Sequence, residues 1–289
     1  MQYRTIVLLL IYAVFLSATE TYAQARSGTL LNPQISLNGL FTAGGSNVDD
    51  KQIQILQGGA HDPQKNGFTV QNVELSMTAA VDPYLNGEAH IIYQLDAEGE
   101  SRLELEEVFF TTQSLPAGIQ LKGGHYFTEF GRLNNKHPHS WSFVDQPIIN
   151  SRLLGGDGLR NPGIRLSWLT PLSLYSELFF GIQNSNGETA ASFLGSAEET
   201  DFEGHLTVKD EVSAIDDLLY SARWLNSVDL TSTTTINLGA SALFGPNATG
   251  ENTRTNIYGV DLYLKWQPLS TVRGWPFVKW QFEWMTRNY

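Results

Sequence analysis

The chain has 289 residues, no cysteine and a formal net charge of −12. So acidic a surface argues against nucleic acid as a partner, because it would repel the phosphate groups. An exported protein of this size without cysteine has no disulfide bonds and depends on a packed core or a closed hydrogen-bonded wall.

The first residues have the layout of a secretory signal peptide. Arg4 supplies a basic start, an apolar run extends from Ile6 to Ala18, and the small residues Ala23 and Ala25 follow it. The run is shorter than the ~20 residues that a transmembrane helix requires, so a retained helical anchor is the weaker alternative. We therefore predict a signal peptide over residues 1–23, and any membrane crossing by the later chain would have to use strands.

From residue 34 onward, apolar and polar residues alternate in segments of about ten residues, the length of a tilted membrane strand. Each segment therefore has one apolar face and one polar face. The clearest segments are Gln34–Ala43, Val73–Val81, Ile119–Phe127, Ile164–Trp168, Leu174–Ile182, Ile236–Phe244, Tyr258–Trp266 and Val278–Trp284. Together with the less regular segments between them, they predict eleven strands.

One segment departs from strict alternation. In Arg102–Thr112 the apolar phase of Leu103 and Leu105 is interrupted by Glu106 and Glu107. A β-bulge inserts one extra residue into a strand and would produce this break, so we predict a bulge here.

The connections between the segments separate two fold classes that alternation leaves open. A soluble β-sandwich buries the apolar faces, whereas a membrane barrel encloses the polar ones. Long and short connections alternate, which favours the barrel. The long ones are Gly44–Gly67, Asp96–Ser101, Thr128–Pro162, Asn184–Asp217 and Gly245–Thr255. The short ones are Asp82–Leu85, Ser114–Ala117, Thr170–Leu172, Asn226–Ser232 and Gln267–Trp275, four of which contain proline.

These features predict an all-β fold, a transmembrane antiparallel β-barrel over residues 24–289 with long extracellular loops and short periplasmic turns. An odd number of strands does not close an antiparallel barrel whose two ends lie in the periplasm. A hairpin hidden in Phe202–Val208 is one explanation, and an incomplete barrel is the explanation we favour.

Several short stretches resemble the phosphate-selective porin superfamily. They are Val73–Ser76, Asp82–Tyr84, Glu106–Phe109, and Gly123–Phe127 followed by Phe130–Arg132. The stretches His137–His139 and Trp141–Pro147 are similar to a branch labelled zinc-regulated, TonB-dependent outer-membrane proteins. The resemblance implies a porin-like barrel, and the zinc label would describe regulation or transport. The chain departs from the superfamily in having Lys+Arg 18 against Asp+Glu 30, which argues against phosphate selectivity.

The third long connection is the one that porins commonly fold inward to narrow the pore. Between residues 128 and 165 it carries five basic residues against three acidic ones, a formal balance of +2. The basic residues are Arg132, Lys136, Arg152, Arg160 and Arg165. Charged side chains at a constriction select ions by sign, so we hypothesise a pore constriction that attracts anions. A solvated loop with local ion pairs is the alternative.

His137 and His139, together with His125 on the preceding segment, form the only histidine cluster in the sequence. Imidazoles two residues apart can both bind Zn²⁺, although such a site needs further ligands. The alternative is a turn shaped by Pro138. Zinc is the only cofactor that the sequence suggests. No G-x-S-x-G motif or similar nucleophile–base pair is present, so we do not expect an enzyme.

The sequence thus predicts a porin-like channel in the Gram-negative outer membrane that passes small hydrophilic solutes or ions. The alternative is a binding or receptor barrel, with or without a zinc link, that uses its long outer loops; a soluble exported sandwich is a third. The expected partners are the lipid bilayer, lipopolysaccharide, and small solutes or ions, with a homotrimer as the assembly to test. The connection of residues 184–217 has a formal charge of −8, and it would attract divalent cations or remain a solvated acidic loop.

Overall fold

The computed structural model describes residues 32–96, 99–196, 201–202, 205–208, 211–250 and 252–289. The predicted signal peptide lies outside them. Eleven strands form one antiparallel sheet in which each strand pairs with the next, and β7 pairs with β10. The strands are β1 (Gln34–Gly44), β2 (Gly67–Asp82), β3 (Leu85–Leu95), β4 (Ser101–Thr112), β5 (Ile119–Phe127), β6 (Arg160–Leu169), β7 (Tyr175–Gln183), β10 (Leu219–Thr231), β11 (Thr234–Pro246), β12 (Arg254–Trp266) and β13 (Val278–Asn288).

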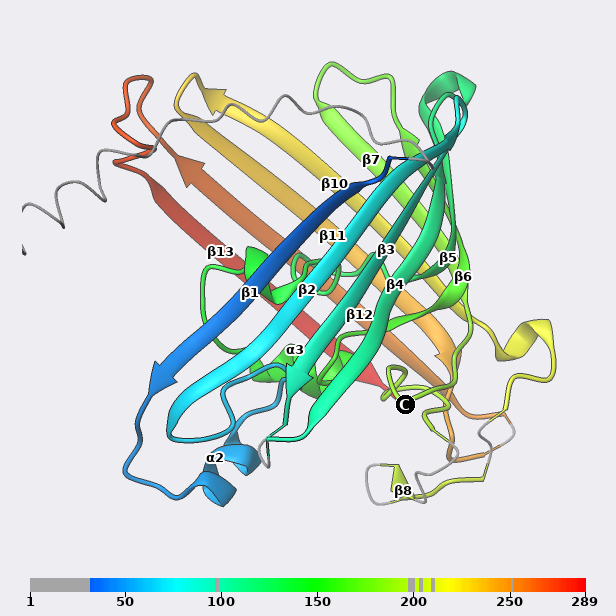
Figure 1. Cartoon of the computed structure of the whole chain (residues 1–289). Helices are drawn as coiled ribbons and strands as arrows, with labels where there is room; N and C mark the ends of the chain where they lie inside the picture. The colour runs from blue at the N-terminus through cyan, green and yellow to red at the C-terminus, as the bar shows by residue number, and fades with distance from the viewer. Residues whose placement is uncertain (1–31, 97–98, 197–200, 203–204, 209–210, 251) are drawn as a thin grey trace, which may run out of the picture.

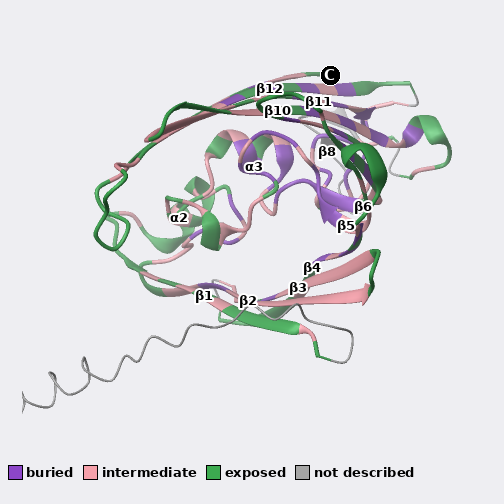
Figure 2. Cartoon of the chain, turned by 90° about the horizontal axis from the view of Figure 1, so that it is seen from above, coloured by how far each residue is buried: buried purple, intermediate pink, exposed green. Residues whose placement is uncertain are grey.

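The sheet curves strongly around an interior space but is not closed (Figures 1 and 2). Among the described residues, β1 and β13 are the two edges and do not pair with each other. In a sheet where each neighbour is antiparallel, the first and the eleventh strand run in the same direction, so they cannot form an antiparallel pair. The all-β antiparallel prediction with eleven strands is confirmed, whereas closure into a barrel is not observed.

Short helices and one small hairpin lie in the connections. They are α2 (Asp50–Leu56), α3 (Ile148–Leu154), and the single turns Pro116–Gly118, Pro138–Ser140 and Ile215–Asp217. A hairpin, which the sequence offers as an alternative in Phe202–Val208, is present as β8 (Asp201–Phe202) and β9 (His205–Leu206), and these strands pair with each other rather than with the large sheet. Within the described part of the chain, no helix has the length and apolar character needed to cross a membrane.

The two faces of the sheet have opposite character. Polar side chains on the concave face are buried, and the apolar phase of the same strands is exposed on the convex face. On β12, for example, Asp261 is 3% exposed and the adjacent Val260 is 45% exposed. Exposed residues of the apolar phase include Ile35, Leu37, Leu103, Ile164, Leu166, Phe180, Ile182, Trp224, Leu238, Trp280, Phe282 and Trp284. The sheet therefore has the inverse of the pattern of a soluble sandwich, which buries its apolar faces.

The predicted bulge in β4 is confirmed. His90 of β3 is opposite Glu107, and the next residue, Ile91, is opposite Leu105, so Glu106 is the extra residue. Successive residues of a regular strand point to opposite faces, but a bulge lets two adjacent side chains share one. Glu106 and Glu107 are both buried on the concave side.

The long connections lie mostly at one end of the sheet, as predicted, and tight turns such as residues 83–84 and 232–233 lie at the other (Figure 1). Three connections depart from the predicted lengths. The turn predicted over Asn226–Ser232 contains only residues 232–233. Residues 96–100 link β3 and β4 with a short loop, and residues 267–277 form a longer one between β12 and β13.

Candidate functional site

The connection between β5 and β6, residues 128–159, folds into the interior of the curved sheet (Figure 2). We call it the inward connection. Apolar packing anchors it on the wall formed by β10–β13. In this core Phe130 and Leu159 of the connection join Leu243, Ile257 and Met285 of the wall. The sequence predicts an inward fold at this position, and the structure places the connection there.

Two backbone hydrogen bonds fix the register of this anchor. The Gly131 N–H donates to Ser241 Oγ at 3.0 Å, and the Arg132 N–H donates to Glu283 Oε1 at 2.8 Å. Gly131 has a φ of 58°, and a Cβ added to it would lie 1.6 Å from Glu283 Oε1. Glycine is therefore required here, because a larger residue would be strained and would displace the carboxylate.

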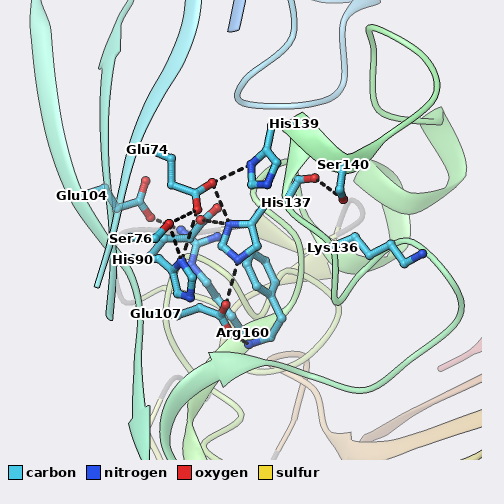
Figure 3. A network of polar contacts seen from close by, with 12 residues as sticks. Glu74, Ser76, His90, Glu104, Glu107, Lys136, His137, His139, Ser140 and Arg160 are labelled. Carbon is cyan, nitrogen blue, oxygen red and sulfur yellow. Dashed lines mark hydrogen bonds and ion pairs between the residues drawn. The ribbon is translucent and has the colours of Figure 1, made fainter. Parts of the chain in front are cut away.

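The tip of the inward connection reaches the opposite wall, β2–β4. There the turn at Pro138–Ser140 brings His137 and His139 against glutamates of the concave face (Figure 3). We call the resulting group the His–Glu cluster. It consists of Glu74 on β2, His90 on β3, Glu106 and Glu107 on β4, and His137 and His139 on the inward connection.

His137 is the centre of the His–Glu cluster. Its Nδ1 lies 2.6 Å from Glu106 Oε2 and 3.3 Å from Glu74 Oε2, and its Nε2 lies 2.9 Å from Glu107 Oε2. Burial alone would lower the pKa of His137, but the contacts with Glu106, Glu107 and Glu74 outweigh it and raise the pKa to about 12. In the absence of another cation, His137 is therefore an imidazolium at neutral pH.

Glu74 links the two remaining histidines to this centre. Its Oε1 lies 3.2 Å from His90 Nδ1, and its Oε2 lies 2.8 Å from His139 Nδ1. Ser76 donates a hydrogen bond of 2.6 Å to the same carboxylate. The imidazole rings of His90 and His137 have centroids 4.7 Å apart. Two neighbouring strands, β2 and β3, and the inward connection therefore converge on a single carboxylate.

The predicted metal ligands are only partly brought together. His137 and His139 both lie in the His–Glu cluster. His125 lies on β5, its backbone opposite Val108 and Pro162, and among the described residues no hydrogen bond or ion pair joins it to the other two. Sequence reasoning missed His90 and the glutamates. The alternation supplies a signal for them, since Glu74 and His90 are polar residues of the enclosed phase.

The basic residues predicted to form a constriction are dispersed rather than arranged in a ring. Arg132 stacks on Tyr263 with a guanidinium-to-ring distance of 3.6 Å, and Arg152 is exposed on α3. Lys136 is partly buried, and burial together with the nearby Arg132 lowers its pKa. The remaining two are buried in ion pairs, Arg160 with Glu104 and Arg165 with Glu129. The sequence did not single out a further buried pair, Arg223 with Asp261.

A polar cavity of about 480 Å³ lies between the β2–β4 wall and the loops at the long-connection end. Its lining residues include Gln71, Gln94, Arg102, Glu104, Asp157 and Glu188. Next to it, His61, Glu104 and Asp157 form a second group whose ligand atoms lie within 4.8 Å of one another. Glu104 is already paired with Arg160, so this second group is less available to a cation.

Comparison with known proteins gives little functional information. No protein-family profile matches the chain. It is similar to an uncharacterised protein of Aquifex aeolicus (strain VF5), with 34% identity over 172 residues. The match covers 56% of this chain and 35% of the relative, so it spans little more than a third of the relative's length.

Proposed function

We propose that the chain forms the wall of an outer-membrane channel of porin type, through which small hydrophilic solutes or ions pass. The observation that carries this proposal is the inverted sheet, with apolar side chains exposed outside and charged side chains buried inside. In water this arrangement is unfavourable, because each exposed apolar side chain forgoes its burial free energy of roughly 1.5–3 kcal/mol. In a bilayer the same side chains meet hydrocarbon, and the arrangement is the expected one.

Aromatic side chains at the strand ends also support the proposal that a lipid bilayer surrounds the sheet. Trp168 on β6, Trp266 on β12 and Trp275 in the β12–β13 connection are exposed, and all lie toward the short-turn end of the sheet, as does Tyr84. Tryptophan and tyrosine favour the boundary between lipid headgroups and hydrocarbon. They would mark the periplasmic rim of the channel.

The interior supports a narrowed polar passage. The inward connection crosses from the β10–β13 wall to the β2–β4 wall. Beside it on β6, Arg160 and Arg165 are paired with Glu104 and Glu129. Both signs of charge therefore line the space, and we propose weak ion selectivity. The anion-attracting constriction that the sequence suggests for the same residues would instead give a preference for anions.

A closed channel also requires partners for β1 and β13. Unpaired backbone groups cost several kcal/mol each in hydrocarbon, so an open sheet edge is not stable there. Each edge must therefore pair with a further strand in the membrane. The resemblance of the region from about Val73 to Leu178 to phosphate-selective porins is compatible with this proposal and identifies no solute.

The test begins with the location and closure of the chain. Full-length protein should be expressed in a Gram-negative host, fractionated, extracted in detergent and run on gels with and without boiling. We expect it in the outer-membrane fraction, with faster mobility before boiling, and with discrete conductance steps in planar bilayers. A chain that stays in solution without detergent would contradict the proposal and favour the soluble sandwich. Membrane insertion without conductance would favour the binding barrel.

A further inference from the structure

The His–Glu cluster brings together more ligand groups than an ordinary ion pair needs. We propose that it binds one divalent first-row transition-metal cation, with Glu74, His90 and His137 as ligands and His139 as the fourth. This inference deepens the proposed function, because the cation would bind in the polar interior and join the inward connection to the β2–β4 wall.

The spacing of the ligand atoms suits such a cation. One carboxylate oxygen of Glu74 and one ring nitrogen each of His90 and His137 all lie within 4.8 Å of one another. In a tetrahedral site with metal–ligand bonds of about 2.0–2.1 Å, neighbouring ligand atoms are about 3.3 Å apart. Glu74 Oε2 lies 3.3 Å from His137 Nδ1 and 2.8 Å from His139 Nδ1, and the other oxygen, Oε1, lies 3.2 Å from His90 Nδ1. Small movements of side chains would complete the site.

Several buried polar atoms of the cluster point to a missing partner. Glu74 and Glu106 are each 1% exposed. Glu74 Oε2, Glu106 Oε2 and His137 Nδ1 are close together, yet none of them has a well-oriented hydrogen bond among the described residues. Leaving a buried polar atom without such a bond costs about 1–3 kcal/mol for a neutral group and more for a charged one. A cation bound by Glu74 and His137 would satisfy two of these atoms, and its charge would offset that of Glu106 beside them.

The second ring nitrogen of His137, Nε2, contacts a carboxylate, as the second nitrogen of a metal-binding histidine commonly does. His137 Nε2 is 2.9 Å from Glu107 Oε2, and the Phe127 N–H donates to Glu107 Oε1 at 2.9 Å. A carboxylate that accepts the N–H of one ring nitrogen leaves the other nitrogen with its lone pair toward the metal. The bulge of β4 makes this possible, because it turns Glu107 inward beside Glu106.

The ligand set also selects the class of cation. Ca²⁺ and Mg²⁺ prefer oxygen ligands alone, whereas imidazole together with carboxylate suits Zn²⁺, Co²⁺, Ni²⁺ and Cu²⁺. Three buried carboxylates carry a formal charge of −3, which a divalent cation with neutral imidazoles largely offsets.

The experiment uses untagged full-length protein, folded in detergent and stripped with EDTA. Co²⁺ is added while the visible absorption of four-coordinate cobalt is followed, and Zn²⁺ binding is measured by calorimetry, with Mg²⁺ and Ca²⁺ as competitors. We expect one equivalent of Co²⁺, displaced by Zn²⁺ and unaffected by Mg²⁺ or Ca²⁺. Because binding is measured without a bilayer, its failure is distinct from the failure of channel activity.

Variants assign the site to these residues. His137→Ala and Glu74→Gln should each weaken binding by about 100-fold or more, since loss of even an outer partner costs 10–100-fold. His125→Ala is the matched control and should bind as the wild type does. Gel mobility before and after boiling shows whether each variant is folded. If His137→Ala does not fold, the double variant His90→Gln, His139→Ala replaces it in the binding experiment. The proposal is overturned by absence of saturable binding, by unchanged affinity in the folded cluster variants, or by an equal loss in His125→Ala.

Discussion

The inward connection contacts two walls of the sheet through different chemistry. On the β10–β13 wall, Phe130 and Leu159 are buried among apolar side chains. On the β2–β4 wall, His137 and His139 meet buried glutamates. Apolar burial does not depend on protons or ions, whereas contact between imidazoles and carboxylates does. The connection therefore has one permanent attachment and one attachment that responds to the solution around it.

The largest effect is expected where the permanent attachment is broken. Phe130 is fully buried, and Phe130→Ala should lower the free energy of unfolding by about 3–5 kcal/mol, because it leaves a cavity in the anchor. Urea unfolding in detergent, followed by tryptophan fluorescence, measures the loss. Phe180→Ala, on the exposed face of β7, is the control and should cost much less. Equal losses of unfolding free energy in the two variants would show that the packing of Phe130 does not anchor the inward connection.

The environment outside the anchoring wall is tested on β13. Phe282 points outward near the middle of this strand, and the adjacent Gln281 points inward. Phe282→Arg should cost about 2–4 kcal/mol in lipid vesicles, because arginine near the bilayer midplane is poorly solvated. Gln281→Arg should cost little. If both variants unfold at the wild-type urea concentration, the outer face of this wall does not meet hydrocarbon.

The strands and their two faces can be predicted from the sequence, because the pattern that specifies them is local. Alternation depends on neighbours in the chain, so it predicts the strands, the two faces and, through Glu106 and Glu107, the bulge. The tip of the inward connection is different. His137 meets Glu74 because a loop crosses the interior, and no local pattern encodes that contact.

His90 and His125 show the limit most clearly. His125 is nearer to His137 in sequence, yet His90 is the one in contact, because its strand pairs with both β2 and β4. His90 is directly opposite Ser76 and Glu107. A prediction of the pairing register of β2, β3 and β4 would therefore have placed His90 beside the glutamates of the cluster. Closure is likewise a property of the whole sheet, which explains why the strand count alone did not settle it.

Metal should separate the two attachments quantitatively. At a Zn²⁺ concentration 100 times the dissociation constant, binding to the folded state alone raises the free energy of unfolding by about 2.7 kcal/mol. We expect this gain in the wild type and equally in Phe130→Ala, whose cluster is intact, and its loss in His137→Ala. Paired unfolding curves in Zn²⁺ and in EDTA provide the measurement. A gain that disappears in Phe130→Ala would mean that the two attachments are coupled.

The smallest effect concerns the hydrogen bonds that support the permanent attachment. Ser241 Oγ accepts from the Gly131 N–H and from Arg223 Nη1, at 3.0 and 2.8 Å, so Ser241→Ala leaves two buried donors short of a partner. Arg223 retains Asp261, and the packing of Phe130 remains, so the loss should be only about 1–2 kcal/mol. Ser227→Ala, which removes a more exposed side-chain bond on β10, is the control. The loss of unfolding free energy in Ser241→Ala should be the same in Zn²⁺ and in EDTA, because among the described residues nothing at this wall contacts the His–Glu cluster. A loss that depends on metal would show that the apolar attachment also responds to the solution.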